Sequence, residues 1–546
     1  MVQFILDNFD TIFRDEKSFQ TFDKMILDLA VRGKLVPQIE DEEPASELLQ
    51  RIKEEKEKPY DIPSSWNWVK LGKVSDILSG KGFESSNFSN KNGVPAIKIT
   101  NIGVGKFIET SDYLPINYLE KYSEYIVVKN DILIALTRPY IKDGLKICTY
   151  QSKFKKALLN QRVALIRTST LLNSEYIFIF MRTDYILEKF KYKFERQGLQ
   201  PNLKNKDIID LCIPLPPLKE QERIVEKVEK LQELSKRFKE IYNSNEKTRA
   251  NLKKSILEEV EKSDTNNELL ISLEKLFGNF EKVIKTKEDV KDIRNLVLSL
   301  AVRGKLVPQI EDEEPASKLL QRIKEEKERL VAEKVIKKEK PLPPITEDEK
   351  PFDIPDSWEW VRLKDIGQIN PRNKAEDDLE TGFIPMKLIN DGLSNLHSFE
   401  VRKWKEIKNG FTHFANGDIV LAKITPCFEN RKSVIIKNLI NEIGAGTTEL
   451  YVYRAYKNLI IPEFILNIFK TEKFITEGVG TYTGTAGQQR VKKDFFENYL
   501  ISLPPIKEQE RIVKRVDELM AVCDTLESKI ETSEKINQKL LASLLK

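Results

Sequence analysis

The feature that most constrains this chain is a 31-residue block that occurs twice. Residues 27–57 read LDLAVRGKLVPQIEDEEPASELLQRIKEEKE, and residues 298–328 read LSLAVRGKLVPQIEDEEPASKLLQRIKEEKE. The copies differ at two positions only, Asp28 against Ser299 and Glu47 against Lys318. They lie 271 residues apart, about half of the 546-residue chain. This spacing indicates a tandem duplication of one long unit and argues against a short-period solenoid.

Each copy has the pattern of a helix, a turn and a second helix. Apolar residues recur at helical spacing and end at Gly33 and Gly304, where glycine can adopt the left-handed conformation that ends a helix. The second helix is predicted to start at Pro44 and Pro315, because a proline at the first helical position gives up no needed hydrogen bond. The sequence therefore predicts the same helix–turn–helix unit twice.

Composition limits the classes of protein and partner. The length implies several domains, and 40% hydrophobic residues can form their cores. Four separated cysteines without a CxxC pair predict a reducing compartment, with no disulfide framework and no zinc site. Because no signal peptide or 18-residue apolar span is present, we expect a soluble, cytoplasmic protein with no membrane partner.

Charge differs between the two stretches that look globular. Residues 60–215 have a net charge of +8, whereas residues 352–504 have a net charge of zero. The first stretch could therefore bind nucleic acid on charge alone, and the second would need a local basic patch.

Two similar α+β domains are predicted from short β-branched and aromatic runs between turn residues. Each domain opens with D-I-P-x-S-W-x-W-V, at Asp61 and at Asp353, where we expect the tryptophans to anchor the core. The predicted strands are 94–101, 131–136 and 163–167 in the first domain and 384–390, 418–424 and 450–454 in the second. The predicted helices are 175–190 and 462–476.

A long helix is predicted after each domain. Both begin at Leu-Pro-Pro-x-Lys-Glu-Gln-Glu-Arg-Ile-Val and continue with apolar residues at heptad spacing, from Ile224 and from Ile512. Polar residues interrupt the first seam at Ser235, Asn245 and Arg249. We expect the central helix, about 217–262, to pair with the helix at about 288–304, and the carboxy-terminal helix to return to the amino-terminal one.

Taken together, these motifs resemble the specificity (S) subunit of type I restriction–modification systems, over essentially the whole chain. The motifs are the duplicated AVRGKLVPQ blocks, the two long-helix starts and the two D-I-P-x-S-W-x-W-V entrances. The implied fold is α+β, with two α/β target-recognition domains separated by long antiparallel coiled-coil helices in a tandem duplication with pseudo-two-fold symmetry. The predicted division is 1–59 amino-terminal helical region, 60–216 first target-recognition domain, 217–351 central helices with a linker, 352–504 second target-recognition domain, and 505–546 carboxy-terminal helix.

The resemblance also implies a function and a set of partners. Each domain would read one half of a bipartite, asymmetric site in double-stranded DNA. The helices would set the gap between the halves and bind two modification (methyltransferase) subunits, with restriction (endonuclease/translocase) subunits joining them. We expect no cofactor on this chain, because S-adenosylmethionine, ATP and Mg would belong to those partners.

No catalytic or metal-binding residue is predicted. The sequence lacks an Asn-Pro-Pro-aromatic methyltransferase signature, a glycine-rich phosphate loop and a helicase motif. Its two histidines, His397 and His413, fall in one domain only, so both halves cannot share histidine-based acid–base or metal chemistry.

Candidate DNA contacts are polar side chains with paired donors and acceptors at predicted strand ends and loops. In the first domain they are Lys98, Thr100, Asn101, Arg138, Lys146, Gln161, Arg162, Gln200, Asn202 and Lys204. In the second domain they are Lys387, Asn390, Lys423, Thr425, Asn430, Arg431, Lys432, Thr447, Thr448, Gln488, Gln489 and Arg490. The loops around Gln200 and Gln488 match each other.

Two other functions remain open from the residues alone. The chain could be a coiled-coil scaffold whose globular domains bind proteins, which the neutral second domain would suit. A self-sufficient nuclease or methyltransferase is a further alternative. DNA affinity without intrinsic methylation or cleavage would separate the specificity subunit from both.

Overall fold

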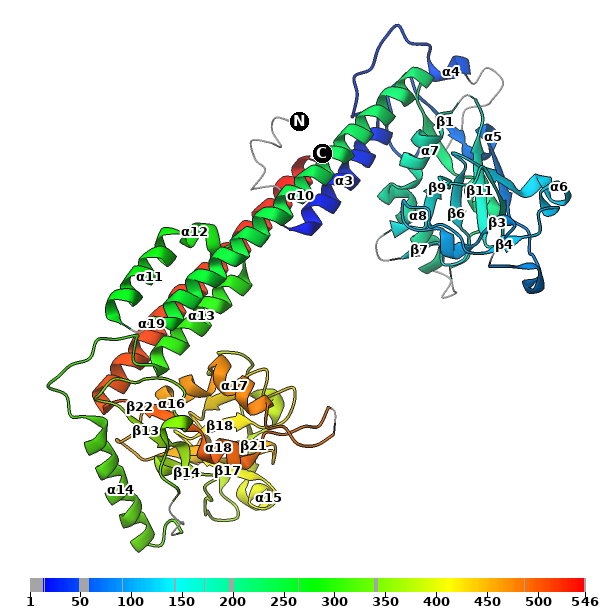
Figure 1. The fold of residues 1–546 in the computed structure, drawn as a ribbon. Helices are drawn as coiled ribbons and strands as arrows, with labels where there is room; N and C mark the ends of the chain where they lie inside the picture. Colours follow the sequence, from blue (N-terminus) through cyan, green and yellow to red (C-terminus); the bar gives the residue numbers. More distant parts are fainter. Residues whose placement is uncertain are drawn as a thin grey trace. The chain divides into compact units, whose positions relative to one another are not determined.

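The computed structural model describes residues 13–544 apart from 14, 49–57, 91, 142–143, 171, 196–200, 264, 338–341 and 486. The chain forms two compact units, residues 1–246 with 535–546, and residues 247–534. Each unit combines a β-rich domain with parts of the two long helices α10 (Leu218–Lys262) and α19 (Ile506–Leu544), as labelled in Figure 1.

Within its described residues, the domain of the first unit has two four-stranded sheets and a two-stranded ribbon. The ribbon pairs β1 (Asn67–Lys70) antiparallel with β12 (Cys212–Leu215), so the chain enters and leaves the domain side by side. One sheet has the order β4-β3-β10-β5, formed by Tyr113–Leu114, Val94–Ile97, Lys156–Leu159 and Ile126–Val128. The other has the order β2-β11-β6-β9, formed by Ser75–Ser79, Val163–Thr168, Ile132–Ala135 and Ile147–Thr149. A further two-stranded pairing is antiparallel, between β7 (Tyr140–Ile141) and β8 (Gly144–Leu145).

Side chains alternate between two cores along the central strand β6. Ile132 and Ile134 lie in the core shared with the helices, whereas Leu133 and Ala135 lie in the core between the two sheets. A strand turns successive side chains to opposite faces, so a continuous apolar run is needed when both faces are covered. The run DILIAL in the sequence is this doubly buried strand.

The helices of the first unit are short within the domain. They are α4 (Ala45–Leu48), α5 (Leu71–Val74), α6 (Tyr118–Lys121), α7 (Ser174–Met181), α8 (Asp184–Glu195) and α9 (Asn205–Ile209). The prediction of one helix over 175–190 was wrong, because the helix breaks between α7 and α8. The Thr183 hydroxyl donates to the Phe180 carbonyl at 2.7 Å and so satisfies a backbone group that continued helix would have used.

The second unit repeats the topology of the first. Its ribbon pairs β13 (Glu359–Arg362) with β22 (Leu500–Leu503). One sheet has the order β16-β15-β20-β17, formed by Glu400–Lys403, Glu380–Ile384, Ile443–Gly446 and Thr412–Ala415. The other has the order β14-β21-β18-β19, formed by Gly367–Ile369, Leu450–Ala455, Ile419–Ala422 and Ser433–Ile435. The helices within the domain are α15 (Trp404–Ile407), α16 (Pro462–Phe469), α17 (Glu472–Val479) and α18 (Lys493–Asn498). The predicted α+β class and the duplication of the domain are thereby confirmed.

Two boundaries in the second domain differ from the sequence-based expectation. The strand predicted over 384–390 ends at Ile384, and residues 386–388 form a 3₁₀ turn after Pro385, which has no N–H for a sheet hydrogen bond. The helix predicted over 462–476 divides into α16 and α17, where the Thr471 hydroxyl donates to the Ile468 carbonyl at 2.7 Å and accepts from the Phe474 N–H at 3.2 Å.

The helix–turn–helix blocks also begin slightly differently from the prediction. Pro315 is the residue before α14 (Ala316–Ala332) and has an extended backbone, so it is not the first helical residue. The Ala316 N–H, which has no partner within the helix, donates to the Ser357 carbonyl at 2.9 Å. The first copy does the same, with the Ala45 N–H donating to the Ser65 carbonyl at 3.0 Å.

In the first unit, α3 (Glu16–Val31) runs antiparallel to the first half of α10. Phe19 packs against Tyr242, and Lys239 pairs with Glu16 at 2.9 Å. Burial raises the pKa of the Asp23 carboxyl of α3, and the buried Ser235, which interrupts the heptad seam, lowers it. A polar pair inside an apolar seam fixes the register of two helices.

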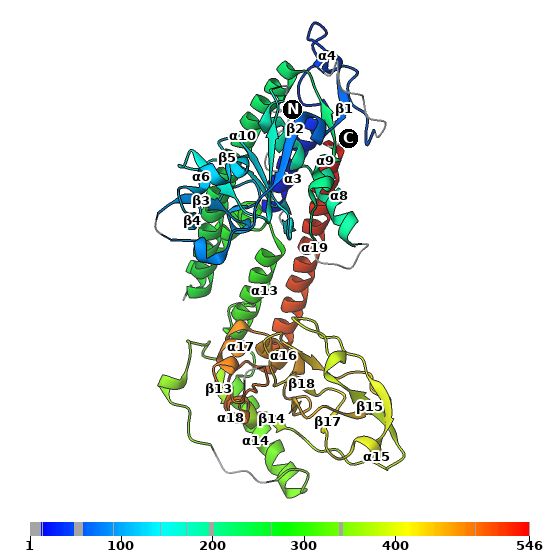
Figure 2. The same ribbon diagram turned by 90° about the vertical axis from the view of Figure 1, so that its right-hand side faces the viewer.

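In the second unit, α13 (Lys287–Val302) lies beside α19 and the second half of α10. Lys287 pairs with Glu531 at 2.5 Å and Arg294 with Asp524 at 2.6 Å, so α13 and α19 run antiparallel, side by side in Figures 1 and 2. Arg249, another interruption of the seam, donates to Asp289 of α13 at 2.8 Å. The predicted pairing of the central helix with the helix at 288–304 is confirmed.

The segment between α10 and α13 contains α11 (Asn266–Gly278) and α12 (Phe280–Val283). At the other end of the chain, residues 535–546 group with the first unit, where α3 lies, but the seam side chains Leu540 and Leu544 fall outside the described side chains. None of the helices in the described part of the chain combines the length and the apolar character required to cross a membrane.

Candidate nucleic-acid interface

Three loops of the first domain are held together by backbone hydrogen bonds at one end of its sheets. The Leu136 N–H donates to the Arg162 carbonyl at 2.9 Å, and the Leu203 N–H donates to the Leu136 carbonyl at 2.8 Å. The Arg138 N–H donates to the Pro201 carbonyl at 2.9 Å. We call residues 136–138, 160–162 and 201–204 the loop frame of the first domain.

The second domain contains the same frame, bond for bond. The Lys423 N–H donates to the Glu449 carbonyl at 2.9 Å, and the Val491 N–H donates to the Lys423 carbonyl at 2.9 Å. The Thr425 N–H donates to the Gln489 carbonyl at 3.0 Å. The loop frame of the second domain is therefore residues 423–425, 447–449 and 488–491. The duplicated backbone displays different side chains at matching positions.

The loop frames gather twelve of the predicted DNA contacts. In the first domain, Arg138, Gln161, Arg162, Asn202 and Lys204 are all exposed. In the second, Thr448 and Gln488 are exposed, and Lys423, Thr425, Thr447, Gln489 and Arg490 are half-buried. Gln200, which aligns with Gln488 in the sequence, lies outside the described residues. Within each domain, these side chains come from separate loops, and one surface of a ligand can contact them together.

Two predicted contact lysines instead stabilise their own domain. The Lys146 ammonium donates to the Ile99 carbonyl at 3.3 Å, and the Lys432 ammonium donates to the Ile389 carbonyl at 2.6 Å. The two lysines occupy equivalent positions in the two domains. The Lys146 backbone carbonyl accepts from the Ala135 N–H at 3.0 Å, and the Lys432 backbone carbonyl accepts from the Ala422 N–H at 2.9 Å. Each of these alanines ends the central strand of its domain. Burial lowers the pKa of Lys146, as expected for an ammonium withdrawn from water.

Several other candidates are also used within the fold. Asn101 is buried, and its side chain accepts from the Lys98 N–H at 2.8 Å and donates to the Ile108 carbonyl at 3.0 Å. The Lys98 ammonium pairs with Asp112 at 3.0 Å and lies over the Phe88 ring. Neither residue is in the loop frame.

Arg431 is a predicted contact whose side chain is bonded within the fold. Its side chain is 9% exposed, donates to Asn295 of α13 at 2.9 Å and forms an ion pair with Glu472 of α17. It therefore anchors the second domain to the helices. Four candidates remain exposed outside the frames, namely Thr100, Lys387, Asn390 and Asn430.

Glu449 is a frame residue that the sequence analysis did not select. It pairs with Arg490 through two hydrogen bonds, 2.9 Å from Nε to Oε2 and 2.8 Å from NH2 to Oε1. The Arg490 pair lowers the pKa of the Glu449 carboxyl, so the carboxylate form is favoured. The predicted DNA contacts were basic, amide and threonine side chains, so no acidic residue was among them. The 287-residue offset that relates the two domains aligns Glu449 with Arg162 and could have identified it.

His413 and Cys148 are both buried within their domains. His413 is 4% exposed, its ring packs against Trp404, and its Nδ1 accepts from the Asn373 N–H at 3.2 Å. Burial raises the pKa of the Cys148 thiol to about 12, which disfavours a thiolate. Among the described residues, no group of three or more His, Cys, Asp or Glu is placed to hold a metal ion.

The repeated motif at the start of each long helix is a joint between helix and domain. The Trp66 indole donates to Glu220 at 2.9 Å, and the Asn173 N–H donates to the Gln221 side chain at 2.8 Å. In the second copy, the Gln309 amide donates to Glu508 at 2.6 Å, and the Ile461 N–H donates to Gln509 at 2.9 Å. Both glutamates and both glutamines are buried. These motif residues therefore position the domain and are not available to a ligand.

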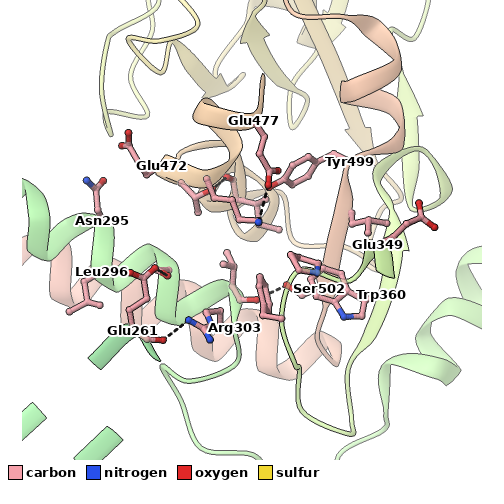
Figure 3. Close-up of a pocket in the computed structure, with 18 of the residues that line it drawn as sticks. Glu261, Asn295, Leu296, Arg303, Glu349, Trp360, Glu472, Glu477, Tyr499 and Ser502 are labelled. Carbon is pink, nitrogen blue, oxygen red and sulfur yellow. Dashed lines mark hydrogen bonds and ion pairs between the residues drawn. The ribbon is translucent and has the colours of Figure 1, made fainter. Parts of the chain in front are cut away.

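A cavity of about 720 Å³ lies between the domain and the helices of the second unit (Figure 3). Trp360 and Tyr499 lie on its domain side and Arg303 on its helix side, and the Ser502 hydroxyl donates to the Val302 carbonyl at 2.5 Å across it. At the matching place in the first unit Trp68 is 1% exposed and packs against Tyr60, which also packs against Tyr185. In the second unit Phe352 packs against Trp360, but Lys473 takes the position of Tyr185, so the third ring of this cluster is missing there.

Comparisons with known proteins place these features in a family. A family model described as the type I restriction modification DNA specificity domain matches residues 63–247 and again residues 355–538. The specificity subunits of the type I restriction enzymes EcoAI and EcoEI, both from Escherichia coli, are 52% and 50% identical to this chain over 257 residues.

Each of these two matches covers 47% of this chain and 44% or 43% of the relative, so the chain spans about half the length of the curated relatives it matches. A solved structure, the HsdS subunit from Thermoanaerobacter tengcongensis, is 18% identical with a TM-score of 0.45, covering 90% of this chain and 98% of that one.

Proposed function

Since the two matched stretches make up most of its length, the chain belongs to the family of the type I restriction modification DNA specificity domain, and we propose that it is the DNA-specificity subunit of a type I restriction–modification complex. Each domain reads one half of a bipartite, asymmetric site in double-stranded DNA through its loop frame. The chain itself catalyses nothing. Methylation and cleavage are performed by the modification and restriction subunits that it directs.

One observation carries the proposal: the two loop frames share their backbone hydrogen bonds but not their side chains. Leu136, Arg162 and Asn202 in the first domain stand where Lys423, Glu449 and Arg490 stand in the second. A common frame with different donors and acceptors is suited to reading different base sequences, because base identity is read from donor and acceptor patterns at base edges. A scaffold protein would have no need of this pattern.

We propose further that the helices space the half-sites and dock the modification subunits. The length and the register of α10 support the spacing. α10 is a continuous helix of 45 residues, about 68 Å long at about 1.5 Å per residue. Ser235 lies opposite Asp23 of α3, and Arg249 pairs with the buried Asp289 of α13, so the register of α10 is fixed on both helices. A helix with a fixed register is a stiff spacer, and half-site spacing follows from the geometry of the binder.

A domain exchange tests the proposal. Residues 61–215 are replaced by the same segment of a related specificity subunit, the chain is expressed with its modification and restriction subunits, and methylated bases are mapped across the genome. We expect one half of the methylated motif to change while the other half stays. Exchange of residues 352–504 is the matched control and should change the other half. Changes in both halves, or in neither, would refute the proposed function.

A further inference from the structure

The loop frame of the second domain holds an arginine in a fixed orientation at its exposed end. The Arg490 guanidinium makes the two bonds to Glu449 described above, and its NH1 donates to the Gln488 carbonyl at 2.8 Å. The arginine is therefore restrained from two directions, by a carboxylate on one loop and by a carbonyl on its own loop. Because rotamer freedom is already lost, little is lost again on binding a ligand.

The donors that remain on Arg490 define what it can bind. A guanidinium has five N–H donors, and the three hydrogen bonds occupy Nε–H, one hydrogen of NH1 and one of NH2. One N–H therefore remains on each terminal nitrogen. The Arg490 side chain is 39% exposed and Glu449 is 25% exposed, so the carboxylate is the more buried partner. The arrangement presents two neighbouring donors and no acceptor.

We infer that Glu449 and Arg490 form a guanine-reading element of the second domain, with Arg490 contacting O6 and N7 of one guanine and Glu449 acting as its positioning residue. Guanine is the base whose major-groove edge offers two acceptors, which two parallel N–H groups match. The inference rests on the proposed function and adds to it the base that this domain requires.

The first domain supplies a contrast at the same frame positions. Arg162 and Asn202 stand where Glu449 and Arg490 stand, so the carboxylate that would position an arginine is replaced by a basic residue. Asn202 is exposed and carries one amide donor–acceptor pair, which suits the N6 and N7 groups of adenine. The guanine-reading element therefore belongs to the second domain alone among the two frames.

The experiment uses the complete complex in its host, with methylated bases mapped for three variants. Arg490→Lys keeps the charge but loses the paired donors, and Glu449→Gln removes the charge that orients the arginine. Arg402→Lys is the matched control, because Arg402 is 37% exposed and pairs with Glu400 at 2.8 Å in the same domain but outside the frame. The exchange of residues 352–504 identifies which half of the motif belongs to this domain.

We expect a guanine at one position of that half and about tenfold to 100-fold weaker discrimination there in Arg490→Lys and Glu449→Gln, with the rest of the motif intact. The control should keep the original motif. Purified complex should also bind a duplex carrying 7-deazaguanine at that position about tenfold more weakly, because N7 is missing, whereas Arg490→Lys should bind both duplexes alike.

An unchanged motif in Arg490→Lys, a half-site without guanine, or equal loss of methylation at all sites in both variants would overturn the inference. The last result would indicate a phosphate contact or a folding role, since neither distinguishes bases. If the domain exchange alters one half-site while these variants do not, the guanine assignment alone fails. If the exchange alters nothing, the proposed function itself fails.

Discussion

Replacement of Ser299 by aspartate should weaken the contact between α10 and α13, although aspartate is the residue of the other copy of the repeat. In the second copy the Ser299 hydroxyl donates to Glu261 of α10 at 3.0 Å, and Arg303 donates to the Glu261 backbone carbonyl. In the first copy the aspartate binds its own helix, since Arg32 donates to Asp28 at 2.7 Å. The residue at this position therefore suits its surroundings in each copy, serine beside Glu261 in the second copy and aspartate beside Arg32 in the first.

The magnitude follows from the geometry. An aspartate at position 299 would bring its carboxylate to roughly 4 Å from that of Glu261, where two like charges repel by about 1 kcal/mol in water and about 4 kcal/mol at an effective dielectric constant of 20. Glu261 is exposed, so the lower figure applies. Loss of the Ser299 hydrogen bond adds about 1 kcal/mol. We expect a total destabilisation of about 2 kcal/mol, a shift in Tm of several degrees at about 2–4 °C per kcal/mol.

The assay is thermal unfolding of the full chain, with hydrogen exchange of the α13 amides to locate the change. High salt should reduce the effect, because exposed charges are screened. Asp28→Ser is the matched control. It removes an i,i+4 pair on a helix surface and should cost only about 0.5 kcal/mol. Glu261→Gln in the Ser299→Asp background should restore most of the stability. An unchanged Tm in Ser299→Asp, or no recovery with Glu261→Gln, would show that the repulsion is not the cause.

Three further predictions concern acid stability, the predicted contact lysine Lys432 and the spacing of the half-sites. Burial alone would raise the pKa of Asp289, but hydrogen bonds from Lys253 and from backbone N–H groups outweigh it and hold the pKa at about 2, below the ordinary 3.8. About 2 kcal/mol of stability should therefore be present above pH 3.8 and be lost as pH falls towards 2, and acid unfolding curves should lack this component in Asp289→Asn. Lys432→Met should leave buried carbonyls unpaired, which costs about 1–3 kcal/mol and lowers Tm, without altering the methylated motif. An altered motif would show that this lysine contacts DNA. α10 and α19 each have residues in both units. Seven residues inserted after Asn245 and after Ser533 should therefore widen the gap between half-sites by up to about three base pairs. An active complex with an unchanged gap would refute the spacer role.

The sequence alone determined the order of elements and their repetition. The duplicated blocks, the doubly buried strand at Ile132–Ala135 and the long helix at Leu218–Lys262 follow from local signals, namely apolar periodicity and turn residues. Even the interruptions of the heptad seam, Ser235 and Arg249, were visible as breaks in the pattern. What each break pairs with was not visible, because Asp23 and Asp289 lie on other helices.

Tertiary structure alone decided which polar side chains face outwards. Lys146, Lys432 and Arg431 have the composition expected of DNA contacts, yet each is bound by groups brought close from distant parts of the chain. The offset between the domains could have pointed to Glu449, but the fold places its carboxylate against Arg490, 41 residues further along. The chemistry of a side chain follows from its residue type. Its free donors and acceptors are those left after long-range contacts have been satisfied, and only the folded chain determines which these are.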